Sequence, residues 1–372
     1  MPKVLISANA AWNIAHFRSA LVKALIADGH EIVAAVGADT SCAALEAMGV
    51  RVQPLPMASQ GISILEDVRL FLRYLALMRR ERPAVFLGWT IKPNVYGSLA
   101  AAITGVPAIN NISGLGTAFI RQGWLGWIAS RLYRLGLRRS VGVFFQNTDD
   151  RDLFLARKLV RPSQVGLLPG SGIDASLFDA RRYPVSDDGL FRFLLVARLI
   201  RDKGIVEYVD AARMLAARYP GVRFQIMGFL DVRNRTAIPR ETVEAWMREG
   251  CIEYLGAADD VRPAVARADC IVLPSYREGR SRVLIEAAAM ERPAIASDVP
   301  GCRDVVQHGR TGLLCRPRDA HDLAEKMRAM LELKRDDRVM MGVNARKDAI
   351  RRFPETEIVD RYRSVISRSL SL

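Results

Sequence analysis

Two glutamates, Glu278 and Glu286, are separated by seven residues and flank the expected start of a helix. The apolar run 270–273 predicts a strand, and a polar elbow leads from it into a helix from about Ser281 to Met290. Backbone N–H groups at such a helix start favour anions, and carboxylates beside it can accept hydrogen bonds from sugar hydroxyls. The pattern fits a nucleotide-sugar. The alternative is one glutamate stabilised by the helix dipole and one solvated in mid-helix.

A second group of charged residues follows another buried strand. The run 191–199 contains Arg198, and Lys203 precedes a helix expected from Ile205 to about Tyr219. Both cations therefore lie at the carboxyl end of a strand, where open α/β sheets bind ligands. The planar Arg fork and the mobile Lys charge suit phosphate oxygens. Otherwise the two residues are ordinary surface cations at a turn.

Together these two groups resemble the retaining glycosyltransferases of the GT-B fold, specifically glycosyltransferase family 4. The signature of that family is the spaced pair of glutamates with an upstream Arg and Lys on the donor diphosphate. The segments 168–174 and 292–301 are also similar to family segments. Within the family, segments 90–97 and 110–116 resemble enzymes that extend lipid-diphosphate-linked sugars in bacterial polysaccharide and glycoprotein-glycan assembly.

The chain departs from the family pattern at two places. Many family members carry a His after the fifth strand of the first domain, where this chain has Asn110, Asn111 and Ser113. Glu291 stands where a Gly is usual, and we expect this change to affect only a helix end.

The resemblance implies roles for the donor-site residues. Glu286 would bind the ribose hydroxyls, and Glu278 the hydroxyls of the transferred sugar. Arg198 and Lys203 would neutralise the diphosphate leaving group, so the expected catalytic residues are Glu278, Arg198 and Lys203. The resemblance implies neither a metal nor a cofactor, and no side chain is identified as a catalytic base. Further donor contacts are expected around the helix start, at Gly279, Arg280, Ser281, Arg282 and Val283.

The resemblance places the acceptor, a polyprenyl-diphosphate-linked sugar, over the first half of the chain. It would enter between the loop 8–13 and the segment 110–116. For His16 and Arg18, a capped helix start with a surface His is an equally good interpretation. The candidate acceptor residues are the polar, basic and Gly positions of these loops and their neighbours: Asn9, Asn13, His16, Arg18, Lys92, Asn111, Ser113 and Gly114.

Apolar strand-like runs alternate with helical patterns along the chain, which predicts an α/β fold with parallel sheets. The resemblance makes this a GT-B fold of two Rossmann-like domains with an interdomain cleft. Residues 1–178 would bind the acceptor and residues 190–353 the nucleotide-sugar, with a polar linker at 179–189. A last helix within 354–372 is expected to return to the first domain.

The composition is that of a globular protein of 372 residues. Its five scattered cysteines include no C-x-x-C pair, which indicates a reducing compartment without disulfides or structural zinc. The chain enters a strand-like run at Lys3, so we expect no signal peptide. No apolar run approaches the ~20 residues of a membrane span, and we expect a cytoplasmic protein.

A formal net charge of +14 indicates an anionic partner or surface. No Asp or Glu occurs from Arg82 to Thr148, where seven Arg and Lys do. The expected helix 124–135 combines Trp, aliphatic and Arg residues, which suits the headgroup layer of an anionic membrane, and helix 64–82 is a second candidate. For both helices the alternative is ordinary packing on the sheet. Nucleic acid is the competing anion, but no nucleic-acid-binding motif is present. We therefore expect a location on the inner face of the plasma membrane.

The expected reaction is transfer of a hexose or N-acetylhexosamine from a nucleotide-sugar, with UDP favoured over GDP, to the lipid-linked acceptor. A GT-B sugar-nucleotide 2-epimerase is the alternative, but it should lack the paired glutamates and the basic surface. A nicotinamide-dependent oxidoreductase should have a G-x-G-x-x-G after the first strand, where residues 7–12 have none. A non-catalytic sugar-nucleotide binder would have lost Arg198 or Lys203. Residues 150–152 match the D-x-D pattern of metal-dependent transferases, but acidic capping of a helix explains them better.

Overall fold

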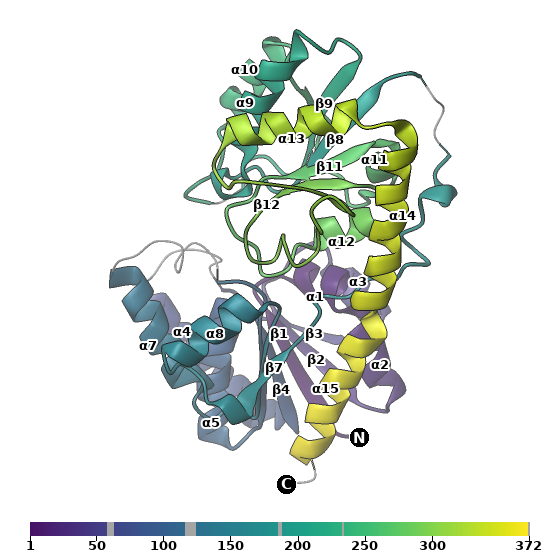
Figure 1. The fold of residues 1–372 in the computed structure, drawn as a ribbon. Coiled ribbons are helices and arrows are strands. Elements are labelled where there is room, and N and C mark those ends of the chain that lie inside the picture. The colour runs from purple at the N-terminus through teal and green to yellow at the C-terminus, as the bar shows by residue number, and fades with distance from the viewer. Residues whose placement is uncertain (58–62, 116–123, 185–187, 233, 371–372) are drawn as a thin grey trace. The chain divides into compact units, whose positions relative to one another are not determined.

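The computed structural model describes residues 1–57, 63–115, 124–184, 188–232 and 234–370, without the side chains of Trp124 and Leu125. The chain forms two compact units, residues 1–172 with 355–372, and residues 173–354. Each unit contains one parallel sheet (Figure 1). The first unit ends at Gly172 rather than at Phe178, because Phe178 packs against the core of the second unit.

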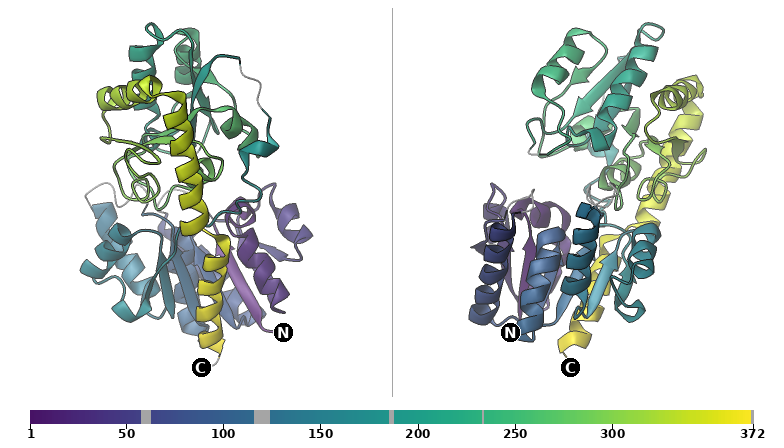
Figure 2. Two further views of the ribbon diagram at one scale, coloured as in Figure 1. Left: turned by 45° about the vertical axis from the view of Figure 1, so that its right-hand side comes forward. Right: turned by 90° about the vertical axis from the view of Figure 1, so that its left-hand side faces the viewer.

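The first unit has a seven-stranded sheet of order β3-β2-β1-β4-β5-β6-β7. Alternate residues of a strand point to opposite faces, so Val4 and Ile6 pack in one core and Leu5 in another, with helices covering both (Figure 2). The strands are β1 Lys3–Ala8, β2 Glu31–Val36, β3 Arg51–Pro54, β4 Val85–Trp89, β5 Ala108–Ile112, β6 Gly142–Phe145 and β7 Val165–Leu167.

One helix of the first unit comes from the far end of the sequence, as expected for a helix that returns to the first domain. Tyr362 of this helix, α15, is buried in the same core as Val4, and its hydroxyl accepts a hydrogen bond of 2.9 Å from Trp89 Nε1. The helices are α1 Ala11–Phe17, α2 Ser19–Ala27, α3 Cys42–Ala47, α4 Ile64–Glu81, the π-helix η1 Pro93–Gly97, α5 Ser98–Thr104, α7 Trp124–Leu137, α8 Thr148–Ala156, the 3-10 turn η2 Pro162–Gln164, and α15 Glu355–Leu370.

The second unit has a six-stranded sheet of order β10-β9-β8-β11-β12-β13. Its strands are β8 Phe191–Val196, β9 Val222–Met227, β10 Glu253–Tyr254, β11 Cys270–Leu273, β12 Ala294–Ser297 and β13 Gly312–Cys315. Its helices are η3 Ala180–Arg182, η4 Arg201–Lys203, α9 Ile205–Ala216, α10 Arg240–Arg248, α11 Arg262–Arg267, α12 Arg282–Ala289, α13 Ala320–Glu332 and α14 Arg335–Arg352. All strand pairings are parallel, so the loops after the strands emerge at one edge of the sheet.

The D-x-D pattern lies at the acidic start of helix α8, and Asn147 caps this helix. Asp150 is buried in the first turn of α8, and its backbone N–H donates to Asn147 Oδ1 at 2.7 Å. Its carboxylate accepts a hydrogen bond of 3.1 Å from Asn147 Nδ2. Among the helices that the structure describes, none is both long enough and apolar enough to cross a bilayer.

Glu291, which stands where a Gly is usual in the family, lies at a helix end, as expected. Glu291 follows α12 with φ of +58°, a conformation that Gly adopts more readily, and Arg292 N–H donates to Ala287 O at 2.9 Å to close the helix end. Helix α14 passes close to this point. A Cβ at Gly342 would clash with the carbonyl oxygen of Glu291, so Gly342 permits the close approach.

Gly342→Ala should therefore lower the free energy of unfolding by about 1–3 kcal/mol, because the backbone oxygen of Glu291 cannot give way as a flexible side chain can. Denaturant unfolding would measure this loss. Gly221→Ala is the matched control, because a Cβ at Gly221 meets no atom within 4 Å. Equal stability of the two variants would contradict the proposed role of this contact.

Candidate functional site

Two loops that follow neighbouring strands of the second unit are bonded to each other. One loop follows β8 and contains η4, and the other follows β11. The carbonyl oxygen of Asp202 accepts hydrogen bonds from Tyr276 N–H at 2.9 Å and from Ser275 Oγ at 3.1 Å. A Cβ at Gly204, which has φ of +73°, would clash with the carbonyl oxygen of Pro274. Gly at position 204 therefore allows the loops to meet.

Lys203 and Glu278 form an ion pair between these loops, through Nζ and Oε1. Their side chains are 21% and 13% exposed, so the pair is shielded but reachable. Arg198 lies at the end of β8 and is exposed. Its side chain makes no hydrogen bond or ion pair with any other residue that the structure describes. The two cations and the carboxylate expected to be catalytic thus occupy the loops at one edge of one sheet.

The start of helix α12 lies beside this ion pair. Ser281 caps the helix, because its Oγ accepts a hydrogen bond of 3.4 Å from Leu284 N–H. The backbone N–H groups of Ser281 and Glu278 are bonded to the carbonyl oxygens of Gly301 and Pro300, at 3.1 and 3.3 Å. The backbone N–H groups of the first turn give the start of a helix a partial positive charge, which suits an anion.

Glu286 is balanced by an arginine one turn earlier on α12. Arg282 Nε donates to Glu286 Oε1 at 2.8 Å, and the two side chains are 16% and 13% exposed. Arg280, an expected donor contact, instead packs inside the unit. Its guanidinium lies 5.5 Å from the ring centroid of Phe353 and 3.9 Å from Asp304, and burial lowers its pKa.

Tyr276 is a residue of this site that the sequence did not single out. Its hydroxyl donates to Glu207 Oε1 at 2.6 Å, and the guanidinium of Arg318 lies 4.5 Å from its ring centroid. Burial raises the pKa of Tyr276 above its usual value. Tyr276 therefore attaches the loop after β11 to helix α9. The available signal was an aromatic residue within an otherwise polar elbow.

The acceptor candidates near the end of β1 lie partly at the surface. The backbone N–H of Asn9 donates to Thr90 Oγ1 at 3.2 Å. His16 stacks on Trp12 with ring centroids 4.6 Å apart, and Asn13 lies between them in α1, partly exposed. The helix start is capped from outside, since Trp12 N–H donates to Asp39 Oδ2 at 3.0 Å. The structural interpretation of His16, as a surface residue on a capped helix, fits this geometry.

Three other acceptor candidates bond within the first unit. Arg18 is 4% exposed, and its guanidinium lies 5.7 Å from the ring centroid of Trp89. Lys92 forms an ion pair of 2.8 Å with Asp67. Asn111 is buried and donates to Tyr362 Oη at 3.2 Å. These three side chains are held by contacts within the unit, while Ser113 is exposed and Gly114 partly exposed just after β5.

Asn110, one of the residues found where many family members carry a His, belongs to a buried polar network. Asn110 Nδ2 donates to Asn94 Oδ1 at 3.0 Å and to Ser98 Oγ at 2.7 Å, and its Oδ1 accepts from Ser140 Oγ at 2.7 Å. All four residues are buried. Because a buried amide needs such partners, Asn110 acts in this structure by fixing β5 against the π-helix and α5.

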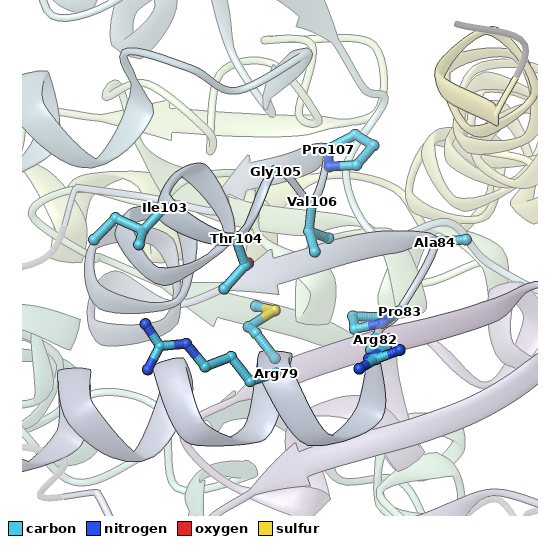
Figure 3. Close-up of a pocket in the computed structure, with 10 residues that line it drawn as sticks. Arg79, Arg82, Pro83, Ala84, Ile103, Thr104, Gly105, Val106 and Pro107 are labelled. Atoms are coloured by element: carbon cyan, nitrogen blue, oxygen red, sulfur yellow. The ribbon is translucent and has the colours of Figure 1, made fainter.

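A depression of about 730 Å³ lies at the edge of the first sheet where β4 and β5 begin, opposite the edge where these strands end (Figure 3). Arg79 and Arg82 of the α4 end line it, with Ile103 and Thr104 of the α5 end. Open parallel sheets bind ligands at the carboxyl ends of their strands, and none of the donor or acceptor candidates lines this depression. Its arginines balance the negative end of the α4 dipole.

The sequence matches two family models. Residues 191–333 match the model described as "Glycosyl transferases group 1", and residues 14–170 match "Glycosyl transferase 4-like domain". The N,N'-diacetylbacillosaminyl-diphospho-undecaprenol alpha-1,3-N-acetylgalactosaminyltransferase of Campylobacter jejuni is 26% identical over 378 residues, which cover 97% of each protein. The UDP-Gal:alpha-D-GlcNAc-diphosphoundecaprenol alpha-1,3-galactosyltransferase of Escherichia coli is 21% identical over 85% of this chain and 83% of the relative.

Solved structures share the fold over the whole chain. HepE of Anabaena, in complex with UDP and glucose, superposes with a TM-score of 0.80 at 19% identity, covering 99% of this chain and 100% of HepE. Sucrose-phosphate synthase of Thermosynechococcus elongatus gives a TM-score of 0.81 at 18% identity, with both chains fully covered. Because both halves of the chain match glycosyltransferase models and the fold is shared throughout, the chain is a glycosyltransferase with the GT-B fold.

Proposed function

We propose that the protein transfers a hexose or N-acetylhexosamine from a nucleotide-sugar to a polyprenyl-diphosphate-linked sugar, with retention of anomeric configuration. The observation that carries this proposal is the Lys203–Glu278 ion pair beside the start of α12. It sets a cation, a carboxylate and a helix N-terminus close together, which matches the needs of a diphosphate joined to a sugar. The diphospho-undecaprenol acceptors named for the Campylobacter and Escherichia relatives support the acceptor class. None of the relatives named above is an epimerase.

The proposed chemistry depends on charge stabilisation. As the glycosidic bond breaks, negative charge builds on the diphosphate oxygens, and Arg198, Lys203 and the α12 N–H groups stabilise it. An incoming diphosphate offers Lys203 a second anionic partner. Glu278 can then accept hydrogen bonds from hydroxyls of the transferred sugar, and Glu286 from those of the ribose. We assign UDP as the favoured nucleotide and assign no metal to the reaction, because these cations supply the positive charge.

Alanine at Arg198, Lys203 or Glu278 should each reduce transfer by about 10²–10³-fold, because each removes a group that stabilises the reacting charge or holds the sugar. The assay offers each variant a short-chain lipid-diphosphate-sugar and a panel of nucleotide-sugars. The rate of nucleotide release measures turnover and therefore the loss. The same panel identifies the donor.

Arg213→Ala is the matched control, since Arg213 forms a surface ion pair with Glu249 at 2.8 Å, away from these loops. It should retain wild-type turnover. Unfolding curves must show that the three site variants remain folded. Near-wild-type turnover in all three folded variants would refute the assignment of the site.

Glu286→Ala should remove discrimination between a nucleotide-sugar and its 2′,3′-dideoxyribose analogue. The wild-type protein should prefer the ribose donor by about tenfold or more in kcat/KM, because the carboxylate would lose its hydroxyl partners with the analogue. Competition between the two donors at equal concentration gives the ratio directly. An unchanged preference in the variant would remove Glu286 from the ribose contact.

We also propose that the protein binds reversibly to the inner face of the plasma membrane through helix α7. Trp127 is 61% exposed, and the guanidinium of Arg131 lies 4.8 Å from its ring centroid. Arg134 is exposed on the same helix, and Arg138 is exposed in the turn directly after it. Each cation near an anionic leaflet contributes roughly 1 kcal/mol. Tyr133 and Leu137 are buried, so α7 packs on the sheet with one face and presents its Trp and Arg residues on another.

Replacing Arg131, Arg134 and Arg138 together by Glu should release the protein from vesicles containing anionic lipid. Binding of the wild-type protein should itself weaken with added salt, because the attraction is screened over about 8 Å at physiological ionic strength. Vesicle sedimentation would follow both effects. The variant should still use a soluble acceptor analogue. If the variant sediments with the vesicles as the wild-type protein does, α7 has only a packing role.

A further inference from the structure

Helix α4 exposes four large aliphatic side chains in its first half. Ile64, Leu65, Val68 and Leu72 are 79%, 59%, 48% and 53% exposed. Positions 64, 68 and 72 recur every four residues and therefore form one line along the helix surface. Position 65 is seven residues, or about two turns, before position 72 and lies on the same side of the helix. These four residues are called the α4 stripe.

The α4 stripe is separate from the face by which α4 packs on the sheet. Leu70, Tyr74, Leu77 and Met78 are buried in the core beneath the helix. Ordinary packing on the sheet accounts for that face alone. A soluble helix normally has one apolar face and presents polar residues to water, and a group of exposed aliphatic side chains such as the stripe suits a second apolar surface.

The position of the stripe in the sheet is informative. Helix α4 connects β3 to the parallel strand β4, so its first turns lie at the edge where the strands end. Two further exposed apolar residues occupy this edge, Ile91 just after β4 and Trp127 in the first turn of α7, at 41% and 61%. The acceptor candidates Asn9 and Ser113 follow β1 and β5 at the same edge. Apolar surface and acceptor loops therefore share one side of the unit.

Charge indicates which apolar surface covers the stripe. Arg69 and Arg73 are exposed on the same helix, and the chain carries a net charge of +14. Asp67 of this segment is neutralised by Lys92, and Glu66 is exposed two residues from both Ile64 and Val68, off the line of the stripe. A second copy of the chain would bring these arginines towards each other. An anionic bilayer attracts the same cations and accepts the aliphatic side chains.

We infer that the α4 stripe inserts into the headgroup and acyl boundary of an anionic bilayer and turns the strand-end edge of the first sheet towards the membrane. This inference rests on the proposed lipid-linked acceptor and deepens it, because a diphosphate at the bilayer surface then meets the acceptor loops directly. It adds to the electrostatic attraction of α7 an apolar contact that salt does not screen.

The first test replaces Leu65 and Leu72 by Ser. Partitioning onto vesicles of phosphatidylcholine with about 30% phosphatidylglycerol should fall about tenfold or more, because two buried aliphatic side chains are lost. The matched control is Ile103→Ser with Val141→Ser, at 59% and 39% exposure, residues that lie where β5 and β6 begin. The control should bind within about twofold of wild type.

The second test reports which edge meets the membrane. All five cysteines are free, and Cys42 is partly exposed while the other four are buried, so Cys42 is first replaced by Ser. A polarity-sensitive fluorophore is then attached to a new cysteine, either Leu65→Cys or Ile103→Cys. Vesicles with brominated acyl chains should quench the label at position 65 and leave the label at position 103 unaffected. Equal quenching, or quenching at 103 alone, overturns the inference.

Two further readouts separate the alternatives. If the Leu65 and Leu72 variant changes the sedimentation coefficient of the protein without changing vesicle binding, a second copy covers the stripe and the inference fails. Turnover of a soluble acceptor analogue should persist in this variant. If the wild-type protein also fails to turn over this analogue, the proposed function is wrong. If the variant loses vesicle binding and keeps its turnover, the result supports the role of the stripe and leaves the proposed function unaffected.

Discussion

The two loops of the proposed donor site are joined through one backbone oxygen. The carbonyl oxygen of Asp202 accepts two hydrogen bonds from the loop after β11, and these bonds hold Lys203 within reach of Glu278. Strands β8 and β11 are neighbours in the sheet although they are distant in sequence. The parallel topology brings their ends together, and the Asp202 bonds convert that proximity into a fixed geometry. Gly204 is required for the same reason, since a side chain there would separate the loops.

Much of this arrangement follows from patterns in the sequence. The run before Arg198 reads as a buried strand and the run after Glu278 as a helix, so both charged groups belong at strand ends. Parallel pairing then places them at the same edge. The expected strand 270–273 coincides with β11, Cys270–Leu273, for this reason, and β8, Phe191–Val196, lies within the expected run 191–199. The ends of strands and helices are local features, and local sequence carries them.

Side-chain partners were harder to predict because they depend on rotamers and on contacts between distant segments. Lys92 was a candidate for contact with the acceptor, and its ion pair with Asp67 on α4 could not be read from spacing. Arg18 was an acceptor candidate with a structural role as an equally good interpretation, and its guanidinium lies against Trp89 in the interior. Arg280 packs against Phe353 from the end of α14. Spacing gives the position of a residue along its element and leaves open which neighbour its side chain reaches.

The return of α15 to the first unit has a consequence for synthesis. Tyr362 is 1% exposed, and its hydroxyl accepts hydrogen bonds from Trp89 Nε1 and Asn111 Nδ2, at 2.9 and 3.2 Å. The ribosome must therefore make residues up to α15 before the core of the first unit can close. Residues 173–354 of the second unit are all available earlier. Domains commonly fold in the order of their synthesis, but here the later unit can be complete while the earlier one still waits for its last helix.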